Sequence, residues 1–366
     1  MPTIAHVAYR YLPLVGGIET YIENLRRVLD QAGYSQTVFQ TDTGASADGV
    51  VCLPRIPHLP NQVSFSLSLR RNRSLWIDAD VMLVHSPEYL LAVRKHPRKI
   101  AIMHGATWTA EDSRLRREVR RRVFSWAIRH RFPIAFNDTF VPRSFGLAVG
   151  PDQFFRAFQG SFWMIPNCVD CDFFRKQPTP YRDEKGRSVI VCARNFTYSK
   201  GADLAVEAFA LFRLRHPDTV LWLVGDSFDD HSREAWYKRY LKETVTRLGV
   251  GDSVLFLGRQ PYDKMPQILS AATLSLVPSR RNEATSLVAL ESMACSVATV
   301  STAVEGLADL PTLKADTNAE AIASAMAEAF EDAERIGRRQ REAVCRTFTL
   351  FNWAEAWKKL VASVLA

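Results

Sequence analysis

The sequence has no stretch of 18 consecutive apolar residues, which argues against a membrane-spanning helix. It begins without a basic segment followed by an apolar one, so we expect no signal peptide. Only six cysteines occur in 366 residues, and their scatter gives no disulfide framework and fits a reducing compartment. These absences predict a cytoplasmic protein and leave open a peripheral contact at the inner membrane face.

Metal-ligating residues do not cluster along the chain. Cys168 and Cys171 form a single C-x-x-C pair, and without a second pair nearby a zinc site is not expected. Two Asp-x-Asp pairs likewise have no further ligands close by in the sequence. We therefore expect neither a metal nor a cofactor.

The positive charge is concentrated in the first half of the chain. Residues 1–166 carry 21 Lys and Arg against 13 Asp and Glu, whereas residues 167–366 carry 26 of each. The whole net charge of +8 therefore belongs to the first half. Such asymmetry indicates an anionic partner, either nucleic acid, an acidic membrane or a phosphorylated acceptor, although a solvated basic face explains it equally well.

Eight arginines lie in residues 114–131, with apolar residues at helical spacing between them. A basic amphipathic helix of this kind can contact anionic lipid. The alternative places the apolar stripe in the core and the arginines in water, and for the helix face the pattern slightly favours this alternative. Attraction of an acidic membrane by the arginine charge stays a hypothesis.

Short apolar runs alternate with segments of helical periodicity, which predicts an α/β fold with parallel sheets covered on both faces. The strands expected are 3–9, 37–39, 81–85, 99–104, 188–193, 220–225, 254–258, 273–277 and 297–301. The helices expected are 18–32, 202–214, 232–248, 264–271 and 287–295, followed by a helical tail over 318–364 that begins soon after Gly306.

The boundary between two such blocks is expected at 165–170, where Pro166 and Asn167 form a turn. Two doubly wound, Rossmann-like domains facing across a cleft are the natural architecture. Ligands of doubly wound sheets bind beyond the carboxyl ends of the strands, so the two domains would share one ligand.

A glycine pair, Gly16 and Gly17, lies between the first strand and its helix. Glycine lets the backbone approach a ligand closely, and a helix N-terminus favours anions. By itself the pair is also consistent with a plain connecting loop. No G-x-G-x-x-G fingerprint of a dinucleotide site is present.

Two cations, Arg194 and Lys200, follow the first strand expected in the second half. Cations at the carboxyl end of a strand suit a diphosphate, whereas a single loop Arg or Lys is usually only solvated. Their position at the expected ligand edge favours binding of an anion.

Glu283 and Glu291 flank the start of the helix expected at 287–295. Ser286 is a good N-cap for that helix, so Glu283 lies in the loop and Glu291 about one turn inside the helix. Carboxylates at these two depths can accept hydrogen bonds from two sets of hydroxyls on one molecule, with phosphates between them at the free amides. Judged by spacing alone, two unrelated surface glutamates are the default interpretation.

His104 ends a buried run at 100–103, which places it at the carboxyl end of a strand. A histidine there is a candidate acid, base or hydrogen-bond donor, and the alternative is a structural histidine. Of the eight histidines it is the one we select as a site residue.

Together these segments resemble the family-4 glycosyltransferases, which have the GT-B fold, and the resemblance runs nearly end to end. The segments that carry it are the glycine loop 13–19, the interdomain Ile-Pro-Asn-Cys-Val-Asp at 165–170, Arg194 with Lys200-Gly201, and Pro278-Ser279 with the pair Glu283 and Glu291 in an E-x7-E signature. The resemblance implies a retaining, metal-independent transfer of a sugar from a nucleoside-diphosphate sugar to a hydroxyl of a glycan, a lipid-linked or a small-molecule acceptor.

The resemblance also implies residue roles. Arg194 and Lys200 would neutralise the diphosphate, Glu291 would hold the ribose hydroxyls, and Glu283 the hydroxyls of the donor sugar. The amides of Ser286 and Leu287, with the Gly16 and Gly17 backbone, would complete the phosphate cradle, and His104 would lie by the donor sugar and the acceptor. Domain 1–166 would carry the acceptor and domain 167–350 the nucleotide sugar, with helix 351–366 packing back on the first domain.

Two other interpretations stay open. The same fold could serve a nucleotide-sugar epimerase, which needs no acceptor, or a glycosyl phosphorylase, which needs free phosphate. The basic first half could instead belong to a binding protein for nucleic acid or membrane with a degenerate site. The transferase is our leading hypothesis, and under it no nucleic-acid partner is expected.

Overall fold

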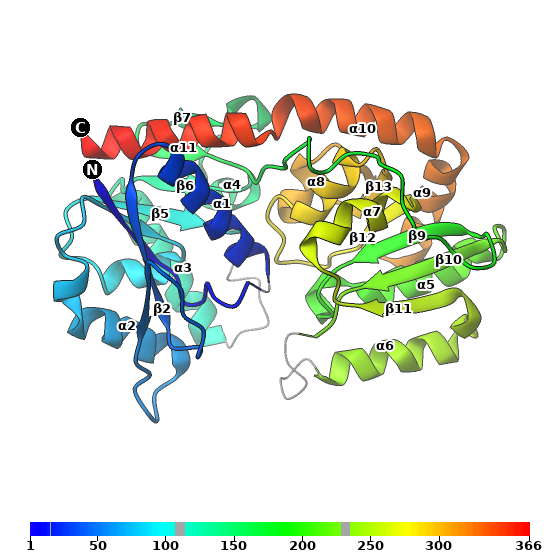
Figure 1. Ribbon diagram of the computed structural model, residues 1–366, viewed down its shortest axis with the longest axis horizontal. Coiled ribbons are helices and arrows are strands. Elements are labelled where there is room, and N and C mark those ends of the chain that lie inside the picture. Colours follow the sequence, from blue (N-terminus) through cyan, green and yellow to red (C-terminus); the bar gives the residue numbers. More distant parts are fainter. Residues whose placement is uncertain (15, 107–113, 228–234) are drawn as a thin grey trace. The chain divides into compact units, whose positions relative to one another are not determined.

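The computed structural model describes the chain except residues 15, 107–113 and 228–234 (Figure 1). The described residues form two compact units. Unit 1 comprises Met1–Pro166 and Phe351–Ala366, and unit 2 comprises Asn167–Leu350. Each is a sheet of mainly parallel strands with helices packed on it, which confirms the expected α/β class.

Unit 1 contains an eight-stranded sheet in the order β3-β2-β1-β4-β5-β6-β8-β7. Its strands are β1 Thr3–Val7, β2 Ser35–Thr41, β3 Val50–Leu53, β4 Val81–Val84, β5 Lys99–Met103, β6 Ile134–Phe136, β7 Arg156–Phe158 and β8 Phe162–Met164. All neighbours pair parallel except β7 and β8. The central strands β1, β4 and β5 are almost wholly buried, which is typical of a sheet covered on both faces.

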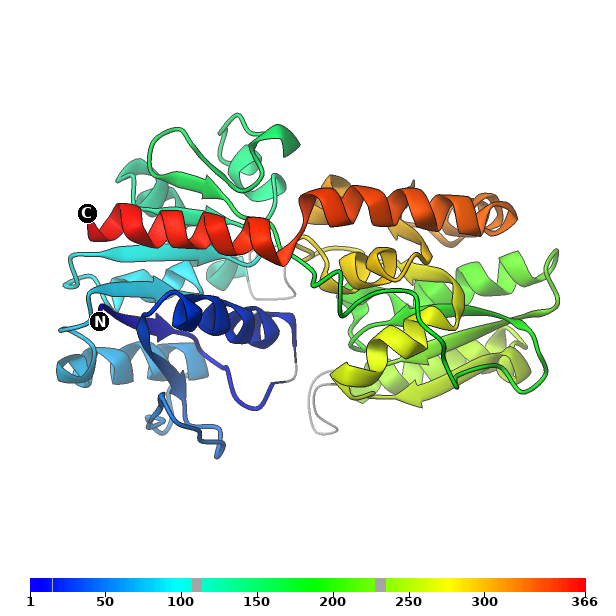
Figure 2. The same cartoon turned by 45° about the horizontal axis from the view of Figure 1, so that its top comes forward.

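The helices of unit 1 are α1 Gly17–Gln31, α2 Asn61–Arg71, α3 Arg114–Arg129, α4 Phe140–Ser144 and α11 Leu350–Leu365. The C-terminal helix α11 lies beside α1 in both views (Figures 1 and 2). Its Trp353 and Trp357 are buried, and Trp357 Nε1 donates a hydrogen bond of 3.1 Å to the hydroxyl of Tyr21 on α1. An apolar face of the last helix therefore completes the core of unit 1.

Unit 2 contains a six-stranded, wholly parallel sheet in the order β11-β10-β9-β12-β13-β14. Its strands are β9 Ser188–Ala193, β10 Thr219–Val224, β11 Val254–Gly258, β12 Ala272–Val277, β13 Ala298–Thr302 and β14 Leu313–Ala315. Its helices are α5 Ala202–Arg213, α6 Ala235–Arg247, α7 Met265–Ser270, α8 Leu287–Ala294, α9 Ala319–Glu331 and α10 Ala333–Thr347. The strand order reverses between β9 and β12, and doubly wound sheets bind ligands at such a reversal.

The strands and helices that were expected agree with the structure to within about two residues at each end, an ordinary uncertainty of such boundaries, whereas α2 was not expected. The helical tail begins at Ala319, close to the expected start, but the short segment between Gly306 and the tail forms the edge strand β14, which was not expected. The tail then divides into α9, α10 and α11. The first residues of the helix expected at 232–248 lie outside the described residues, and α6 accounts for the rest.

The cysteines form no disulfide framework, as expected from their scatter, but the described residues contain one disulfide that the sequence did not predict. Cys171 and Cys345 are joined in unit 2, with their Cα atoms 6.0 Å apart and a sequence separation of 174. Sequence spacing gives no sign of a bond across so long a separation. The thiols of Cys52, Cys168, Cys192 and Cys295 are free.

No helix in the described ranges 1–14, 16–106, 114–227 and 235–366 has both the length and the apolar character needed to cross a bilayer.

Candidate functional site

The reversal point of the unit 2 sheet brings Arg194 and Lys200 next to Glu283. Arg194 directly follows β9, Lys200 ends the short 3-10 helix η5 (Tyr198–Lys200), and Glu283 lies in the loop after β12. Gly201 explains why η5 reaches this loop. It has a φ of +71°, and a Cβ there would lie 2.0 Å from the carbonyl oxygen of Pro278, so only glycine permits this approach.

One carboxylate oxygen of Glu283 collects three hydrogen bonds. Arg194 Nη2 donates at 2.5 Å, Lys200 Nζ at 2.7 Å and Ser279 Oγ at 2.8 Å, all to Oε2. Burial opposes ionisation of Glu283, but the charges of Arg194 and Lys200 outweigh it and lower its pKa to about 2. Burial in turn lowers the pKa of Lys200, against the Glu283 charge. The cluster is therefore an ionised, preorganised group with two cations for one carboxylate.

The loop that carries Glu283 is fixed through its backbone. The Glu283 amide donates to Glu305 Oε2 at 2.8 Å, and its carbonyl accepts from the Gly306 amide at 2.9 Å. Thr302 Oγ1 donates to the carbonyl of Ser279 at 2.6 Å. Sequence reasoning named Ser279 as part of the Pro278-Ser279 segment but missed Thr302 and Glu305 as supports of the site, because these two bind backbone groups that no motif specifies.

Arg194 retains an unused donor. Its guanidinium is 4% exposed, and the buried Nη1 has no hydrogen-bond partner among the described residues. A buried donor without an acceptor costs stability and is rare in folded proteins. An anionic oxygen bound beside Arg194 would satisfy it.

Glu291 lies in the second turn of α8 and is 8% exposed. Burial raises its pKa to about 7, and no other group contributes to this shift. Within the described residues its carboxylate has no hydrogen-bond donor. Glu291 is thus a nearly buried carboxylate that is available to accept hydrogen bonds from a ligand, and it lies on the same chain segment as Glu283.

Ser286 occupies the N-cap position of α8 with an extended backbone, but its hydroxyl makes no capping hydrogen bond. The cap chemistry expected from the sequence is therefore wrong, although the position is right. The helix start at Leu287 keeps its first amides free of intrahelical partners, as any helix does. These amides carry the partial positive charge of the helix start.

In unit 1, Gly16 is the N-cap of α1 and adopts an extended conformation, and Gly17 begins that helix. His104 directly follows β5 at the carboxyl edge of the sheet. Burial lowers the pKa of His104 to about 3, so at neutral pH it is an uncharged imidazole that accepts or donates hydrogen bonds.

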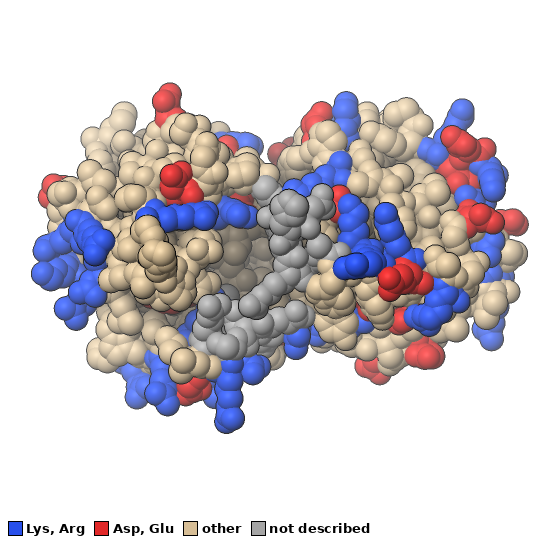
Figure 3. Space-filling view, turned by 90° about the horizontal axis from the view of Figure 1, so that it is seen from below, with Lys and Arg blue, Asp and Glu red and all other residues tan. Residues whose placement is uncertain are grey.

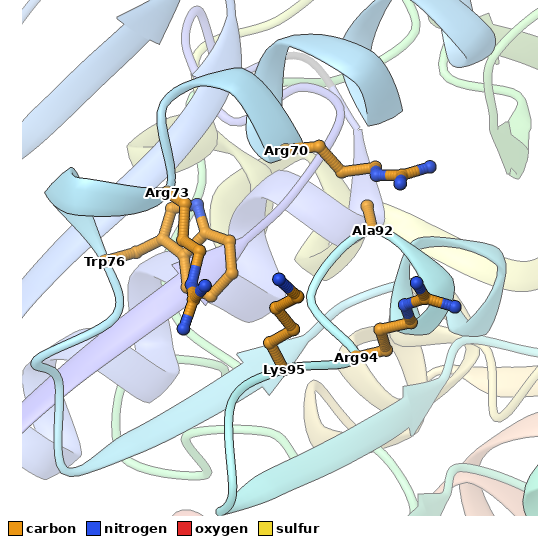
Figure 4. A pocket seen from close by; sticks show the side chains of 6 residues that line it. All are labelled: Arg70, Arg73, Trp76, Ala92, Arg94 and Lys95. Atoms are coloured by element: carbon orange, nitrogen blue, oxygen red, sulfur yellow. The ribbon is translucent and has the colours of Figure 1, made fainter.

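The excess positive charge of unit 1 lies partly around a cavity of about 140 Å³ (Figure 4). Arg70, Arg73, Arg94 and Lys95 surround it together with Trp76 and Ala92, and none of these four cations forms an ion pair with a described residue. Lys and Arg side chains are also more prominent than acidic ones over unit 1 on the face shown in Figure 3.

The first turns of α3 carry a second cationic surface, lined by Arg114, Arg117, Glu118, Arg121 and Arg122. The apolar stripe of this helix is divided. Val123 and Ala127 are buried, whereas Leu115 and Val119 are 74% and 49% exposed. The interpretation that the whole stripe faces the core is therefore wrong for the first half of α3.

Comparisons with known proteins agree with this architecture. The chain matches the family described as Glycosyltransferase Family 4 over residues 15–135 and that described as Glycosyl transferases group 1 over residues 173–343. Its structure resembles sucrose-phosphate synthase of Thermosynechococcus elongatus, with a TM-score of 0.82 and 20% identity over 100% of this chain and 99% of that one. It also resembles Anabaena HepE in complex with UDP and glucose, with a TM-score of 0.80 and 17% identity over 99% and 100% of the two chains.

The fold is therefore GT-B. The chain belongs to the family-4 glycosyltransferases. Among curated relatives, it is 38% identical over 112 residues to D-inositol 3-phosphate glycosyltransferase of Acidothermus cellulolyticus. That match covers 30% of this chain, and the chain spans only 24% of the length of that relative.

Proposed function

We propose that the protein transfers a sugar from a nucleoside-diphosphate sugar to a hydroxyl acceptor, with retention of configuration and without a metal ion. The observation that carries the proposal is the cluster at the unit 2 sheet reversal, where Arg194 and Lys200 are held ready by Glu283 and one buried guanidinium nitrogen is unused. The similar fold of Anabaena HepE, in complex with UDP and glucose, supports a donor of this class.

In the proposed role, Arg194 and Lys200 bind the diphosphate. Negative charge builds on the leaving diphosphate as the bond to the sugar breaks, and fixed cations stabilise it with little reorganisation. The amides of Ser286 and Leu287 at the start of α8 add partial positive charge. Catalysis would then rest on charge stabilisation and positioning, and no metal would be needed.

The two glutamates would bind different hydroxyl groups of the donor. Glu291, which lacks hydrogen-bond donors, would accept from the two ribose hydroxyls, and Glu283 would accept from hydroxyls of the sugar through the oxygen that the cations leave unused. From unit 1, the Gly16 and Gly17 backbone would add donors for the phosphates and His104 would contact the sugar and the acceptor. The acceptor would be a glycan, a lipid-linked or a small-molecule glycoside.

A panel of UDP-, GDP-, ADP- and dTDP-sugars is expected to identify the donor by thermal shift. A ligand that binds only the folded state stabilises it by about 2.7 kcal/mol at a hundred times its dissociation constant. One base and sugar should therefore raise the melting temperature by several degrees, and the Arg194→Ala variant should lose that rise. Absence of a shift for every donor would contradict the proposal, and analysis of products would separate transfer from epimerisation or phosphorolysis.

We also propose that the protein acts in the cytoplasm and touches an anionic membrane through residues 114–131. The exposed Leu115 and Val119 beside the arginines of α3 support this contact, because insertion of apolar side chains and attraction of cations act together at such a surface.

Sedimentation with vesicles tests the membrane contact. The protein should pellet with phosphatidylglycerol vesicles but not with pure phosphatidylcholine, and the double variant Leu115→Ser with Val119→Ser should bind about tenfold more weakly, since two apolar side chains leave the lipid. Leu214, which is 81% exposed on unit 2, supplies the control Leu214→Ser, which should bind like the parent. Equal binding to both lipids would overturn the idea.

A further inference from the structure

Three histidines form a hydrogen-bonded row across the centre of the unit 1 sheet. His6 lies in β1, His85 directly follows β4 and His104 directly follows β5, on three neighbouring strands. Their ring planes are nearly parallel, within 15° for His6 and His85 and 7° for His85 and His104, and the ring centroids lie 5.3 and 5.5 Å apart. His6 and His85 are buried, and only His104 is partly accessible.

Each pair of rings is joined by one hydrogen bond. His6 Nδ1 lies 3.1 Å from His85 Nε2, and His85 Nδ1 lies 3.2 Å from His104 Nε2. At one end of the row His6 Nε2 lies 3.0 Å from Gln36 Oε1, and at the other His104 Nδ1 lies 3.4 Å from Asn137 Nδ2. Both nitrogens of all three rings are therefore used.

The direction of these hydrogen bonds follows from the Gln36 end. Gln36 Nε2 donates to the carbonyl of Arg26 at 2.7 Å, so its Oε1 is the atom that accepts from His6 Nε2. Burial lowers the pKa of His6 to about 4, that of His85 well below the ordinary value and that of His104 to about 3. Each ring is thus neutral and has a single N–H, which the geometry must place.

The position of the N–H on one ring determines the position of the N–H on the next ring. With its proton on Nε2, His6 has a lone pair on Nδ1 and accepts from His85 Nε2. His85 in turn accepts on Nδ1 from His104 Nε2. His104 is left with a lone pair on Nδ1, where the contact with Asn137 is longer than an ordinary hydrogen bond.

From this row we propose that His85 and His6 are positioning residues. They fix His104 as the Nε2–H tautomer, so that its Nδ1 accepts a hydrogen bond from a substrate hydroxyl at the carboxyl edge of the unit 1 sheet. The inference rests on the proposed function, since a sugar or acceptor hydroxyl is the donor it requires. The long contact from Asn137 is the weakest in the row and the easiest for a hydroxyl to replace.

Among the described residues, no carboxylate shifts the pKa of the three rings, and aromatic side chains pack against the row. Tyr21 of α1 meets the rings of His85 and His104 edge-on at 6.3 and 4.7 Å, and Trp357 of α11 donates to the Tyr21 hydroxyl. Arg26 of α1 is the charged side chain that acts on His6, and it favours the neutral ring. Neutral imidazoles between pH 5.5 and 8.5 are therefore the expected state of all three.

Long-range 1H–15N correlation spectra of 15N-histidine-labelled protein test the row directly. All three rings should show the Nε2–H pattern, with no titration over that pH range, and the donor identified by the panel should move the His104 Nδ1 resonance. In His85→Leu the pattern at His104 should become a tautomer mixture, and kcat should fall about tenfold, the effect of one hydrogen bond, with the KM of the donor little changed. In His85→Gln the amide can also donate and accept hydrogen bonds, so recovery of the His104 tautomer and of kcat in this variant would indicate a positioning role.

The same experiment has clear contrary results. An Nδ1–H pattern at His104 in the parent protein, or unchanged kcat in His85→Leu where His104→Ala lowers it, would overturn the inference. If His85→Leu does not fold, Gln36→Met at the far end of the row should produce the same tautomer change, and His216→Gln in unit 2 is the control that should not. A normal spectrum combined with failure of every donor to bind would reject the proposed function and leave the tautomer row standing.

Discussion

Replacing Glu283 by alanine is expected to lower the free energy of unfolding by about 3–5 kcal/mol and yet to preserve binding of a nucleoside diphosphate. The substitution leaves the buried Arg194 and the partly buried Lys200 without their shared carboxylate. A diphosphate restores the missing negative charge, so it should raise the melting temperature of Glu283→Ala more than that of the parent. Sugar transfer should be lost, because the group proposed to hold the sugar is gone.

Two control variants separate charge from packing. Glu283→Gln keeps the shape and should show most of the same destabilisation. Glu207 pairs with Arg247 at the surface of unit 2, and Glu207→Ala should lower the free energy of unfolding by less than about 1 kcal/mol. Chemical denaturation with and without UDP measures both effects. Destabilisation that UDP does not reverse would show that the cations do not meet the diphosphate.

The same cluster sets the acid sensitivity of unit 2. The pKa of Glu283 is about 2 in the folded protein, below its ordinary value of 4.5. A lowered pKa means that the folded state holds this proton more weakly than the unfolded state does. The stabilisation by Glu283 is therefore fully present above about pH 4.5 and is lost as the pH falls toward 2.

The second large effect is expected at Glu291, where affinity for the nucleoside-diphosphate sugar should rise with pH. In the free protein burial raises the pKa of Glu291 to about 7, so near neutrality a large fraction is protonated. A ribose diol that donates to the carboxylate favours the ionised form, and binding should release a proton. The dissociation constant should fall by up to about tenfold per pH unit below 7 and level off above it.

Calorimetry in two buffers of different ionisation enthalpy measures the released proton. The intact nucleotide sugar is the right ligand, because its phosphate diesters do not titrate near neutral pH. Glu291→Gln should abolish the pH dependence, and Glu291→Ala should weaken binding about 100-fold through loss of two charged hydrogen bonds. Proton uptake, or unchanged affinity in Glu291→Ala, would show that Glu291 does not hold the ribose; Glu320→Gln on the surface of α9 is the neutral control.

Much of the fold could be predicted because its longer strands are continuous apolar runs. β9 and β11 were expected with the bounds observed, since continuous apolar runs between turns leave little freedom. The strands β6, β7, β8 and β14 have three residues each, too few to show a period. They owe their existence to pairing with neighbours that the sequence does not reveal.

The site followed the same division. Motif spacing predicted that Glu283, Arg194 and Lys200 lie at the same sheet edge. It did not predict that one carboxylate oxygen of Glu283 accepts hydrogen bonds from both cations. Among the histidines, His104 alone was selected, although His85 also ends an expected strand. His6 and His85 gain meaning only from the strand order, which places β1, β4 and β5 side by side.

The bond between Cys171 and Cys345 has a topological consequence. The two residues stand just inside the two ends of unit 2, which runs from Asn167 to Leu350. Nearly the entire unit is thus a covalent ring closed by the disulfide, and the chain enters and leaves unit 1 next to that disulfide. A single backbone cut at an exposed position such as Gly186 would open the ring but leave the two fragments covalently linked. The fragments could separate only after a thiol reduced the disulfide between Cys171 and Cys345.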